Sequence, residues 1–582
     1  MRTSLQRTLI ASIAMFTMVC GTSAQGSTQG GEYVIQGIFS PTIADAQKKD
    51  FRPEPIDTIL PERPVKFDVI SVKADIPSKV DSLAAAKLNV IQSQQKLYKG
   101  FVKAGFGLYT TPLAELYYDQ TRSRDSGFGL HVKHMSSNGG INDVGPSTYG
   151  FNQVNGYYNH YLRNHEVGGR LMYDRRRVSY YGFDATDSIL SLIDVSAPAD
   201  DDLKQVYNDI GFAGRIRSLY KDSTLIAHDI GLEVHSYSSL SESRETNVRI
   251  TADLSKAEQG DRYGLGILID NNAFRGKEAN GLFGETQSTT LGDQRTNGTI
   301  VGLTPLLTRQ GDKYVVRVGA GMYVDAQGST SFHFFPKAYL SYSLFDDILV
   351  PYIGLEGERR RNSFRSLTRE NPWLIGRPQL ENSSQLYDFY GGLRGSFSSR
   401  IGFDMRMSIS SIDDRPLYVS APNAPYGDRM AVVYDRVDVF NISGELSYRY
   451  DDALRLKGRI DVSTYGTSYE LEAWNLPPYQ IALGATYNLR DKLSVTFEAQ
   501  FLGQRKAAYY TNPADATAEV RIDPKVQDLD GYLDLHLGLE YRYTKRLSVF
   551  LDMSNLSASK YERWYRYPVQ RGLLLGGLTY SF

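Results

Sequence analysis

The stretch Gly572-Leu573-Leu574-Leu575-Gly576-Gly577-Leu578-Thr579-Tyr580-Ser581-Phe582 decides the fold. Its side chains alternate with a period of two, as in a β-strand. One face carries Leu574, Leu578, Tyr580 and Phe582, and the other carries Thr579 and Ser581. An apolar row that ends on aromatic residues is typical of a strand that faces lipid in an outer-membrane β-barrel. We predict that Leu578, Tyr580 and Phe582 form the signal that the Gram-negative barrel-assembly machinery reads.

The first residues have the pattern of a secretory signal peptide. Arg2 and Arg7 precede the apolar run Leu9–Val19, and the small residues before Ala24 suit a cleavage site. We therefore expect residues 1–24 to be a signal peptide. Cys20 would allow lipidation as an alternative, but Val19 stands where a lipobox needs Gly or Ala. Cleavage after Ala24 would remove the single cysteine, and disulfides and thiolate chemistry with it.

The composition fits a barrel and disfavours other classes. After the signal peptide there is no run of about eighteen apolar residues, and the mean hydropathy is −0.36, so a helical membrane protein is not expected. The 52 Gly, 41 Tyr and 25 Phe suit close-packed strands with aromatic girdles. A net charge of −1 gives no indication of nucleic acid as a partner.

Alternating segments recur along the chain. The clearest is Leu533–Tyr543, in which Leu and Tyr alternate with polar and charged residues, and residues 403–410 and 454–462 repeat the pattern. A soluble sandwich could also alternate, but it would rarely place so many charges on one face of strand after strand.

Short polar turns alternate with longer connections. The short ones lie near 122–126, 163–165, 221–223, 259–262, 310–313, 345–347, 398–400, 450–452, 490–492 and 544–546. After a tight connection at 110–112, the others lie near 137–148, 177–204, 239–243, 274–294, 326–331, 360–385, 411–431, 464–480, 503–530 and 556–571. We predict an antiparallel transmembrane barrel of about 22 strands over residues 98–582, with both termini in the periplasm.

Two arginine triplets indicate where strands end relative to the hydrocarbon of the membrane. Arg175–Arg177 and Arg359–Arg361 would each put at least one cation on the lipid face, where an Arg at the bilayer centre costs roughly 2–4 kcal/mol. We expect both triplets beyond the hydrocarbon, at extracellular strand ends. They would serve as snorkelling residues, or as contacts with the phosphates of lipopolysaccharide.

The last thirty residues resemble TonB-dependent receptors. Asn555-Leu556 after a strand, then Tyr561, then Tyr567-Pro568-Val569-Gln570-Arg571-Gly572, is similar to the closing pattern of that family. The resemblance in architecture covers residues 98–582. The family's plug domain should precede the barrel, but residues 25–97 show no plug signature, so coupling to TonB is not implied.

The sequence of residues 25–97 predicts an extended periplasmic segment. Prolines at 53, 55, 61, 64 and 77 favour extended backbone, and the apolar residues have no period. The stretch Phe39–Lys49 is similar to N-terminal segments of receptor-like barrels that lack a plug. We interpret the whole segment as a tether.

A barrel of this size without a plug would be a wide pore, so something must close it. The candidates are residues 25–97, the long loops at 177–204, 360–385 and 503–530, and a partner subunit. The loops carry aromatic residues that bind a partner or pack among themselves over the mouth. The partner-binding candidates are Tyr180, Tyr181, Phe183, Trp373, Tyr509 and Tyr510.

The inward strand positions carry both charges. The predicted lumen-lining residues are Arg317, Arg394, Asp404, Arg406, Glu445, Arg455, Lys457, Arg459, Asp461, Glu498, Asp534 and Glu540. Mixed charge favours a lattice of cross-strand pairs that stiffens the wall. The arginines between 394 and 459 leave an anion track as the alternative.

No catalytic, cofactor or metal site is predicted. His131 and His134 point to opposite faces of a strand and cannot share a metal ion. The acidic runs at 200–202 and 528–530 lack the spacing of a calcium loop.

Three functions from different classes stay open. The first is binding or transport of a solute by a plugless relative of TonB-dependent receptors. The second is a structural subunit that anchors an outer-membrane complex through its loops and tether. The third and weakest is an outer-membrane enzyme, because no catalytic group is found. The solute and the partner are not identified by the sequence.

Overall fold

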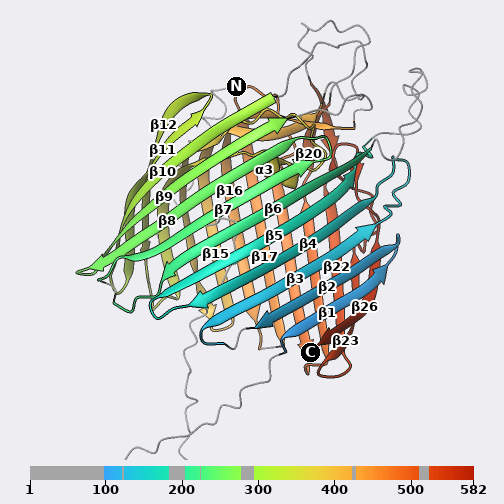
Figure 1. The fold of residues 1–582 in the computed structure, drawn as a ribbon, viewed down its shortest axis with the longest axis horizontal. Coiled ribbons are helices and arrows are strands. Elements are labelled where there is room, and N and C mark those ends of the chain that lie inside the picture. The colour runs from blue at the N-terminus through green and yellow to red at the C-terminus, as the bar shows by residue number, and fades with distance from the viewer. Residues whose placement is uncertain are drawn as a thin grey trace, which may run out of the picture. The chain divides into compact units, whose positions relative to one another are not determined.

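The structure is a computed structural model that describes residues 98–120, 123–182, 203–222, 224–276, 294–421, 428–451, 453–509 and 524–582. The predicted signal peptide and tether lie outside these residues. One antiparallel sheet of 22 strands dominates the described chain (Figure 1). Among the described residues, no helix is long and apolar enough to cross a membrane.

The first eleven strands of the sheet are β1 (Gly100–Gly107), β2 (Thr111–Gln120), β3 (Ser126–Ser137), β4 (Tyr149–Tyr161), β5 (His165–Ser179), β6 (Lys204–Ser218), β7 (Ala227–Ser239), β8 (Arg244–Glu258), β9 (Asp261–Gly276), β10 (Gln294–Gln310) and β11 (Tyr314–Gln327). The other eleven are β12 (Ser329–Tyr342), β13 (Leu349–Arg360), β14 (Ser383–Ser398), β15 (Ile401–Ser420), β16 (Met430–Arg449), β17 (Leu454–Thr467), β18 (Tyr479–Leu489), β19 (Leu493–Leu502), β22 (Tyr532–Arg542), β23 (Leu547–Ser554) and β26 (Leu573–Ser581). Outside the sheet lie the helix α3 (Phe364–Glu370) and the short strands β20 (Arg505–Tyr509), β21 (Lys525–Leu529), β24 (Glu562–Trp564) and β25 (Tyr567–Pro568).

The sheet closes on itself between its first and last strands. Each strand pairs with its neighbours in the chain, and β1 pairs with β26 from Phe101 opposite Ser581 to Gly107 opposite Leu575. The backbones approach closely at this seam, where a Cβ on Gly577 would meet the carbonyl oxygen of Ala104 at 2.1 Å. The predicted fold class, a closed 22-stranded antiparallel barrel, is confirmed.

The connections follow the predicted alternation. Gly100 and Phe582 lie at one end of the barrel, which we call the turn end, and all ten predicted short turns join strands there. The long connections lie at the other end, which we call the cap end. The connections between β15 and β16 and between β11 and β12 are much shorter than predicted. β15 ends at Ser420 and β16 begins at Met430, and Gly328 alone separates β11 from β12. Gly328 has a φ of +72°, a conformation that glycine adopts without strain.

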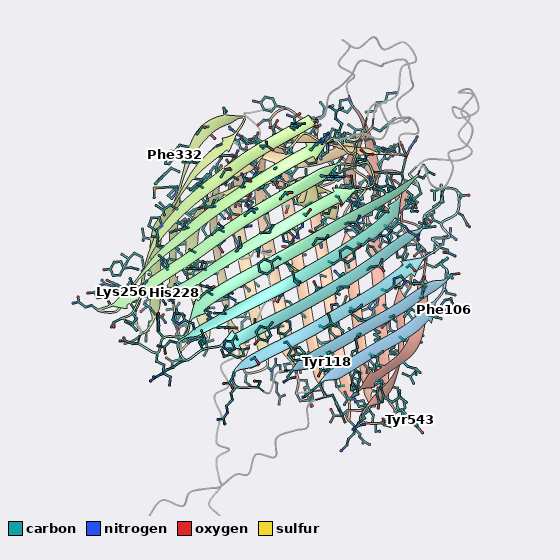
Figure 2. All side chains as sticks on the ribbon, viewed as in Figure 1. Phe106, Tyr118, His228, Lys256, Phe332 and Tyr543 are labelled. Carbon is teal, nitrogen blue, oxygen red and sulfur yellow. The ribbon has the colours of Figure 1, made fainter. Side chains whose placement is uncertain are left out.

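Large apolar side chains cover the outside of the barrel. Phe106, Phe332 and Tyr543 project outward from the strands (Figure 2), and each is more than half exposed. The same side of β26 carries Leu578, Tyr580 and Phe582, all of them exposed. A closed sheet with an apolar outer belt satisfies its backbone hydrogen bonds internally, as a strand-built membrane protein must.

Candidate functional site

The main feature inside the barrel is the connection between β13 and β14, residues 361–382, which we call the lid. The lid leaves the wall at β13 and reaches β5, eight positions away in the ring of 22 strands. There the indole nitrogen of Trp373 donates to the carbonyl oxygen of Ser179 at 3.0 Å, and the Tyr180 hydroxyl donates to the carbonyl oxygen of Leu374, also at 3.0 Å. A contact over this separation crosses the lumen, so the lid lies across the cap end.

The lid begins with the helix α3, whose ends are specified locally. The Ser363 hydroxyl accepts a hydrogen bond from the Ser366 amide, and the Ser366 hydroxyl accepts one from the Ser363 amide, which is a capping box. Pro372 follows the C-cap residue Asn371 and prevents the helix from continuing. The sequence therefore sets a short helix inside a loop.

A carboxylate from the wall completes the N-terminus of α3. Glu245 of β8 is buried, and its carboxylate accepts hydrogen bonds from the amides of Phe364 at 2.6 Å and Arg365 at 3.2 Å. Negative charge is favourable beside the free amides of a helix N-terminus. Glu245 is thus a fixed attachment point for the lid.

Asp209 of β6 is the second attachment point. Its carboxylate is buried and lies 2.6 Å from the Arg365 Nε, 2.8 Å from the Arg369 Nη2 and 3.0 Å from the His235 Nδ1. Ile210, next to it in the strand, is exposed on the outside of the barrel, so Asp209 faces the lumen. Both arginines belong to α3, so this cluster binds the helix to the wall.

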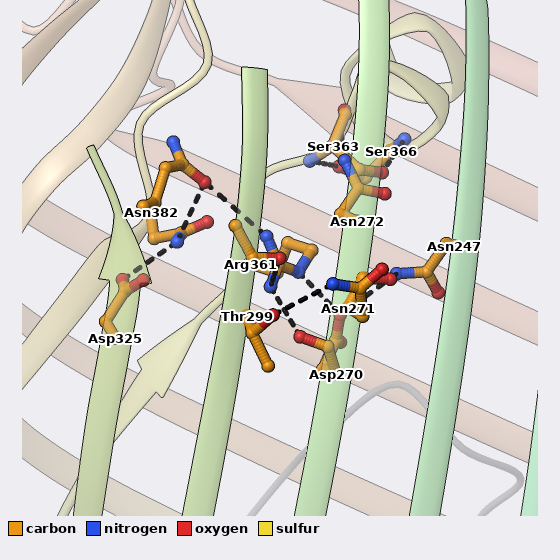
Figure 3. Close-up of polar contacts among 12 residues, drawn as sticks. Asn247, Asp270, Asn271, Asn272, Thr299, Asp325, Arg361, Ser363, Ser366 and Asn382 are labelled. Atoms are coloured by element: carbon orange, nitrogen blue, oxygen red, sulfur yellow. Dashed lines mark hydrogen bonds and ion pairs between the residues drawn. The ribbon is translucent and has the colours of Figure 1, made fainter. Parts of the chain in front are cut away.

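Asp270 of β9 and Asp325 of β11 bind the first and the last residue of the lid (Figure 3). Arg361 donates to the Asp270 carboxylate at 2.5 Å, and the Asn382 amide donates to the Asp325 carboxylate at 2.8 Å. Arg359 also pairs with Asp325, at 2.8 Å. Both carboxylates are buried, and a buried charge is tolerated only when it is paired. We call Asp209, Glu245, Asp270 and Asp325 the latch carboxylates.

Apolar side chains of the wall pack against the helix of the lid. Phe364 is completely buried, and its ring lies 5.1 Å from that of Phe274, 5.7 Å from that of Tyr237 and 6.2 Å from that of Tyr207. Tyr207 also donates to the carbonyl oxygen of Pro372 at 2.8 Å. Burying a Phe side chain contributes roughly 1.5–3 kcal/mol, so the lid is held by its core as well as by its ion pairs.

The connection between β23 and β26 packs against the lid. The Tyr567 ring stacks on Trp373 at 4.1 Å and meets Tyr181 edge-on at 5.0 Å. The Tyr567 hydroxyl donates to the carbonyl oxygen of Asp428, and the Tyr181 hydroxyl donates to that of Pro568 at 3.0 Å. Four cap-end connections therefore meet around Tyr567.

The residues that carried the family resemblance organise this connection. Asn555 is buried, and its amide donates to the carbonyl oxygens of Ser559 and Gln570 at 2.8 and 2.9 Å. Tyr561 stacks on Tyr532 at 3.8 Å and donates to the Asp534 carboxylate at 2.8 Å. The motif is thus the framework that places Tyr567 over the lid.

Four of the six predicted partner-binding aromatics lie among the described residues, and each packs against another aromatic residue. Tyr180 is buried, and Tyr181 and Trp373 are partly buried in the cap, which matches the alternative of packing over the mouth. Tyr509 stacks on Tyr565 at 5.4 Å. Phe183 and Tyr510 lie outside the described residues.

All twelve predicted lumen-lining residues lie on the strand face opposite the exposed apolar side chains. Several form cross-strand pairs, such as Arg406 with Asp388 at 2.6 Å and Lys457 with Glu445 at 3.0 Å. Arg317 lies over the Tyr339 ring at 5.2 Å. Their part in a solute path stays a prediction.

The arginine triplets lie at the cap end and divide between the two faces of the wall. Arg359 and Arg361 point inward to the latch carboxylates, whereas Arg360 pairs with Glu358 on the exposed side. Arg176 lies over the Phe151 ring at 5.6 Å and donates to the carbonyl oxygen of Arg369. Arg176 therefore contacts the lid, Arg361 joins the lid to the wall, and Arg359 pairs at its base, and none of the three points to the outer face where lipopolysaccharide would lie.

The latch carboxylates are not among the site residues predicted from the sequence. Each is an acidic residue at an inward position near the cap end of its strand, and the lid carries Arg361, Arg365 and Arg369. This complementarity of charge was the available signal. Only the three-dimensional course of the lid shows which carboxylate meets which arginine. Within the described ranges, no group of His, Cys, Asp and Glu is arranged to hold a metal ion.

Comparison with known proteins places the fold. No protein-family model matches the sequence, and no curated protein sequence matches it. Among solved structures, the FrpB iron transporter from Neisseria meningitidis superimposes with a TM-score of 0.62 at 11% identity, covering 84% of this chain and 82% of that one. The pyoverdine outer membrane receptor FpvA from Pseudomonas aeruginosa, bound to pyoverdine, gives 0.60 at 14% identity, covering 83% and 78%. A complex of FpvAI with pyocin S2 gives 0.60 at 13% identity, covering 83% and 73%.

The chain therefore has the closed 22-stranded barrel fold of the TonB-dependent siderophore receptors. The similar proteins are described as receptors and transporters. Whether a plug precedes the barrel concerns residues 25–97, which lie outside the described residues.

Proposed function

We propose that the protein is an outer-membrane receptor that binds and admits a solute, and that the lid is its gate. The observation that carries the proposal is the lid itself, which the latch carboxylates fix across the mouth of a barrel otherwise wide enough for large solutes. Receptor and transport roles of similar barrels support it. Loops placed on a rigid scaffold are where such proteins carry function.

The proposed orientation puts the cap end outside the cell and both termini in the periplasm, because outer-membrane barrels have short periplasmic turns and long extracellular loops. Single cysteines at Ser329 and Lys545, exposed positions at the cap end and the turn end, test it. A membrane-impermeant maleimide added to whole cells should label Ser329→Cys and leave Lys545→Cys unlabelled until the cells are lysed. The opposite pattern would invert the topology.

The gate is tested by locking it. Leu374 of the lid pairs with Met430 of β16, flanked by hydrogen bonds of 2.9 Å on both sides, which brings the two Cα atoms within the range for a disulfide. In planar bilayers we expect the wild type to be closed most of the time with rare openings. The oxidised double variant Leu374→Cys, Met430→Cys should show no openings, and reductant should restore them. Each single variant is the control, and openings that persist in the oxidised form would disprove the gate.

A second function, an anchoring subunit, is supported by the connection between β17 and β18. Tyr469 and Leu471 are 82% and 62% exposed at the cap end, as apolar residues that dock a partner would be. A wild type that never opens in bilayers and is isolated with a stoichiometric partner would favour this function over the gate.

A further inference from the structure

A cavity of about 300 Å³ lies against the inner wall of β3 to β7, beside the C-terminal end of α3. Part of its lining is one cross-strand row in which Met135, Phe151, Arg176 and Tyr207 are successive register partners. Three of these side chains are apolar or aromatic, and a guanidinium stands among them. The row therefore offers a flat apolar surface with one cation.

Arg176 has a hydrogen-bond donor that no acceptor of the described residues satisfies. One NH group donates to the carbonyl oxygen of Arg369 at 3.2 Å, and the Nε is buried with no hydrogen-bond partner among the described residues. Its guanidinium lies over the Phe151 ring. A buried donor without a partner is costly, which favours an acceptor supplied by a ligand.

The neighbouring row adds a second cation. Lys133 is two strands, about 10 Å, across the wall from Asp174, and Arg176 lies two residues, about 7 Å, further along the same strand as Asp174; both side chains are long enough to converge. The ion pair of Lys133 with Glu115 is long, at 3.9 Å. Between the two cations lies Gln153, whose amide donates to Asp174 at 3.5 Å, the limit of a hydrogen bond.

The acidic residues of the cavity do not cancel this charge. Asp209 already accepts from Arg365, Arg369 and His235. Asp174 is the other acid, and Arg369 approaches it at 3.9 Å. The lining therefore holds three cations, Lys133, Arg176 and Arg369, against two acids, Asp174 and Asp209.

We propose that this cavity binds a small organic anion, a carboxylate on a planar apolar body. The carboxylate lies between Arg176 and Lys133, and the body lies on Phe151. The inference rests on the proposed function, to which it adds the class of solute. A volume near the lower end of small-molecule sites admits roughly ten to fifteen non-hydrogen atoms.

The test is binding of 4-fluorobenzoate to the full chain in detergent, followed by fluorine NMR. We expect saturable binding, with 4-fluorobenzyl alcohol and 4-fluorobenzylamine at least about tenfold weaker, because only the carboxylate meets both cations. Arg176→Met should weaken 4-fluorobenzoate at least about tenfold, and Lys133→Gln about threefold. Absence of saturable binding, or equal binding of the amine, would overturn the proposal.

Arg175→Met is the matched control, because Arg175 is the next residue of β5 and points to the opposite face. It should leave the affinity unchanged. Since Arg176 also touches the lid, the Lys133→Gln variant decides whether a loss comes from the site, because the ion pair of Lys133 is with Glu115 of β2. Undiminished binding in Lys133→Gln would contradict the assigned site. Binding in micelles does not depend on gating, so a bound anion in a barrel that never opens would refute the gate and keep the site.

Discussion

Replacing residues 362–381 with a four-residue Gly-Ser linker should convert a mostly closed barrel into an open pore. In planar bilayers the mean current should rise by at least about tenfold, since a 22-stranded wall without a filling encloses a wide aqueous channel. Cells that carry the variant should become sensitive to large antibiotics that the outer membrane excludes. The wall should still assemble, because Arg360 and Ser383 are paired at the base of the deleted segment, so a short linker can join them.

Two adjacent arginines give this prediction a matched pair of point variants. Arg361 points inward, is 7% exposed and pairs with Asp270, whereas Arg360 pairs with Glu358 and Gln385 on the other face. Arg361→Ala leaves the buried Asp270 carboxylate with its hydrogen bond from Asn247 but without its cation, a change that typically costs about 3–5 kcal/mol. We expect frequent openings in Arg361→Ala and wild-type behaviour in Arg360→Ala. A deletion variant that folds and stays closed would show that another part of the chain, or a partner, forms the seal.

The strands of the wall could be predicted from the sequence, because the alternation of apolar and polar residues within each strand shows which side chains face outward and which face the lumen. In β17, Leu456 and Ile460 alternate with Lys457 and Arg459, and a closed barrel turns the first pair outward and the second inward. The turns also depend on local residues, since Arg490 and Asp491 both adopt positive φ in the three-residue connection between β18 and β19.

The lid could not be derived in the same way. Its helix has local signals in Ser363 and Pro372, but its place depends on Asp209, Glu245 and Asp270, which are 91 to 160 residues earlier in the chain than the lid residues that they bind. Charge alone does not choose between these acids, because any of them could pair with any arginine of the lid. The course of the backbone across the lumen makes that choice. The aromatic residues of the loops could not be assigned from the sequence for the same reason. An exposed Trp373 and a packed Trp373 have the same sequence pattern, and only the structure shows that Tyr567 stacks against it.

The seam between β1 and β26 is held differently from the rest of the wall. It joins segments from the two ends of the described chain, so no turn fixes its register, and the pairing must specify itself. The amide of Phe582 donates to the carbonyl oxygen of Gly100 at 2.9 Å, and the amide of Gly100 donates back at 3.0 Å. The Phe582 ring lies over Gly100, where a Cβ would meet it at 2.2 Å. The outward aromatic row therefore aligns the two strands.

Replacing both Tyr580 and Phe582 with Ser should strongly reduce the amount of assembled protein in the outer membrane. Tyr580 and Phe582 are 43% and 46% exposed, so each change costs less than the roughly 1.5–3 kcal/mol of a fully buried aromatic side chain, but both changes fall at the one seam that lacks a turn. The measurement is the folded fraction in outer-membrane preparations, read from the heat-modifiable shift on a gel. The exchange Tyr580→Phe with Phe582→Tyr keeps the aromatic row and should assemble normally. Ser581→Ala, on the inward face, should do the same. Wild-type levels of the double Ser variant would mean that hydrogen bonding alone closes the barrel and that Leu578, Tyr580 and Phe582 carry no assembly signal.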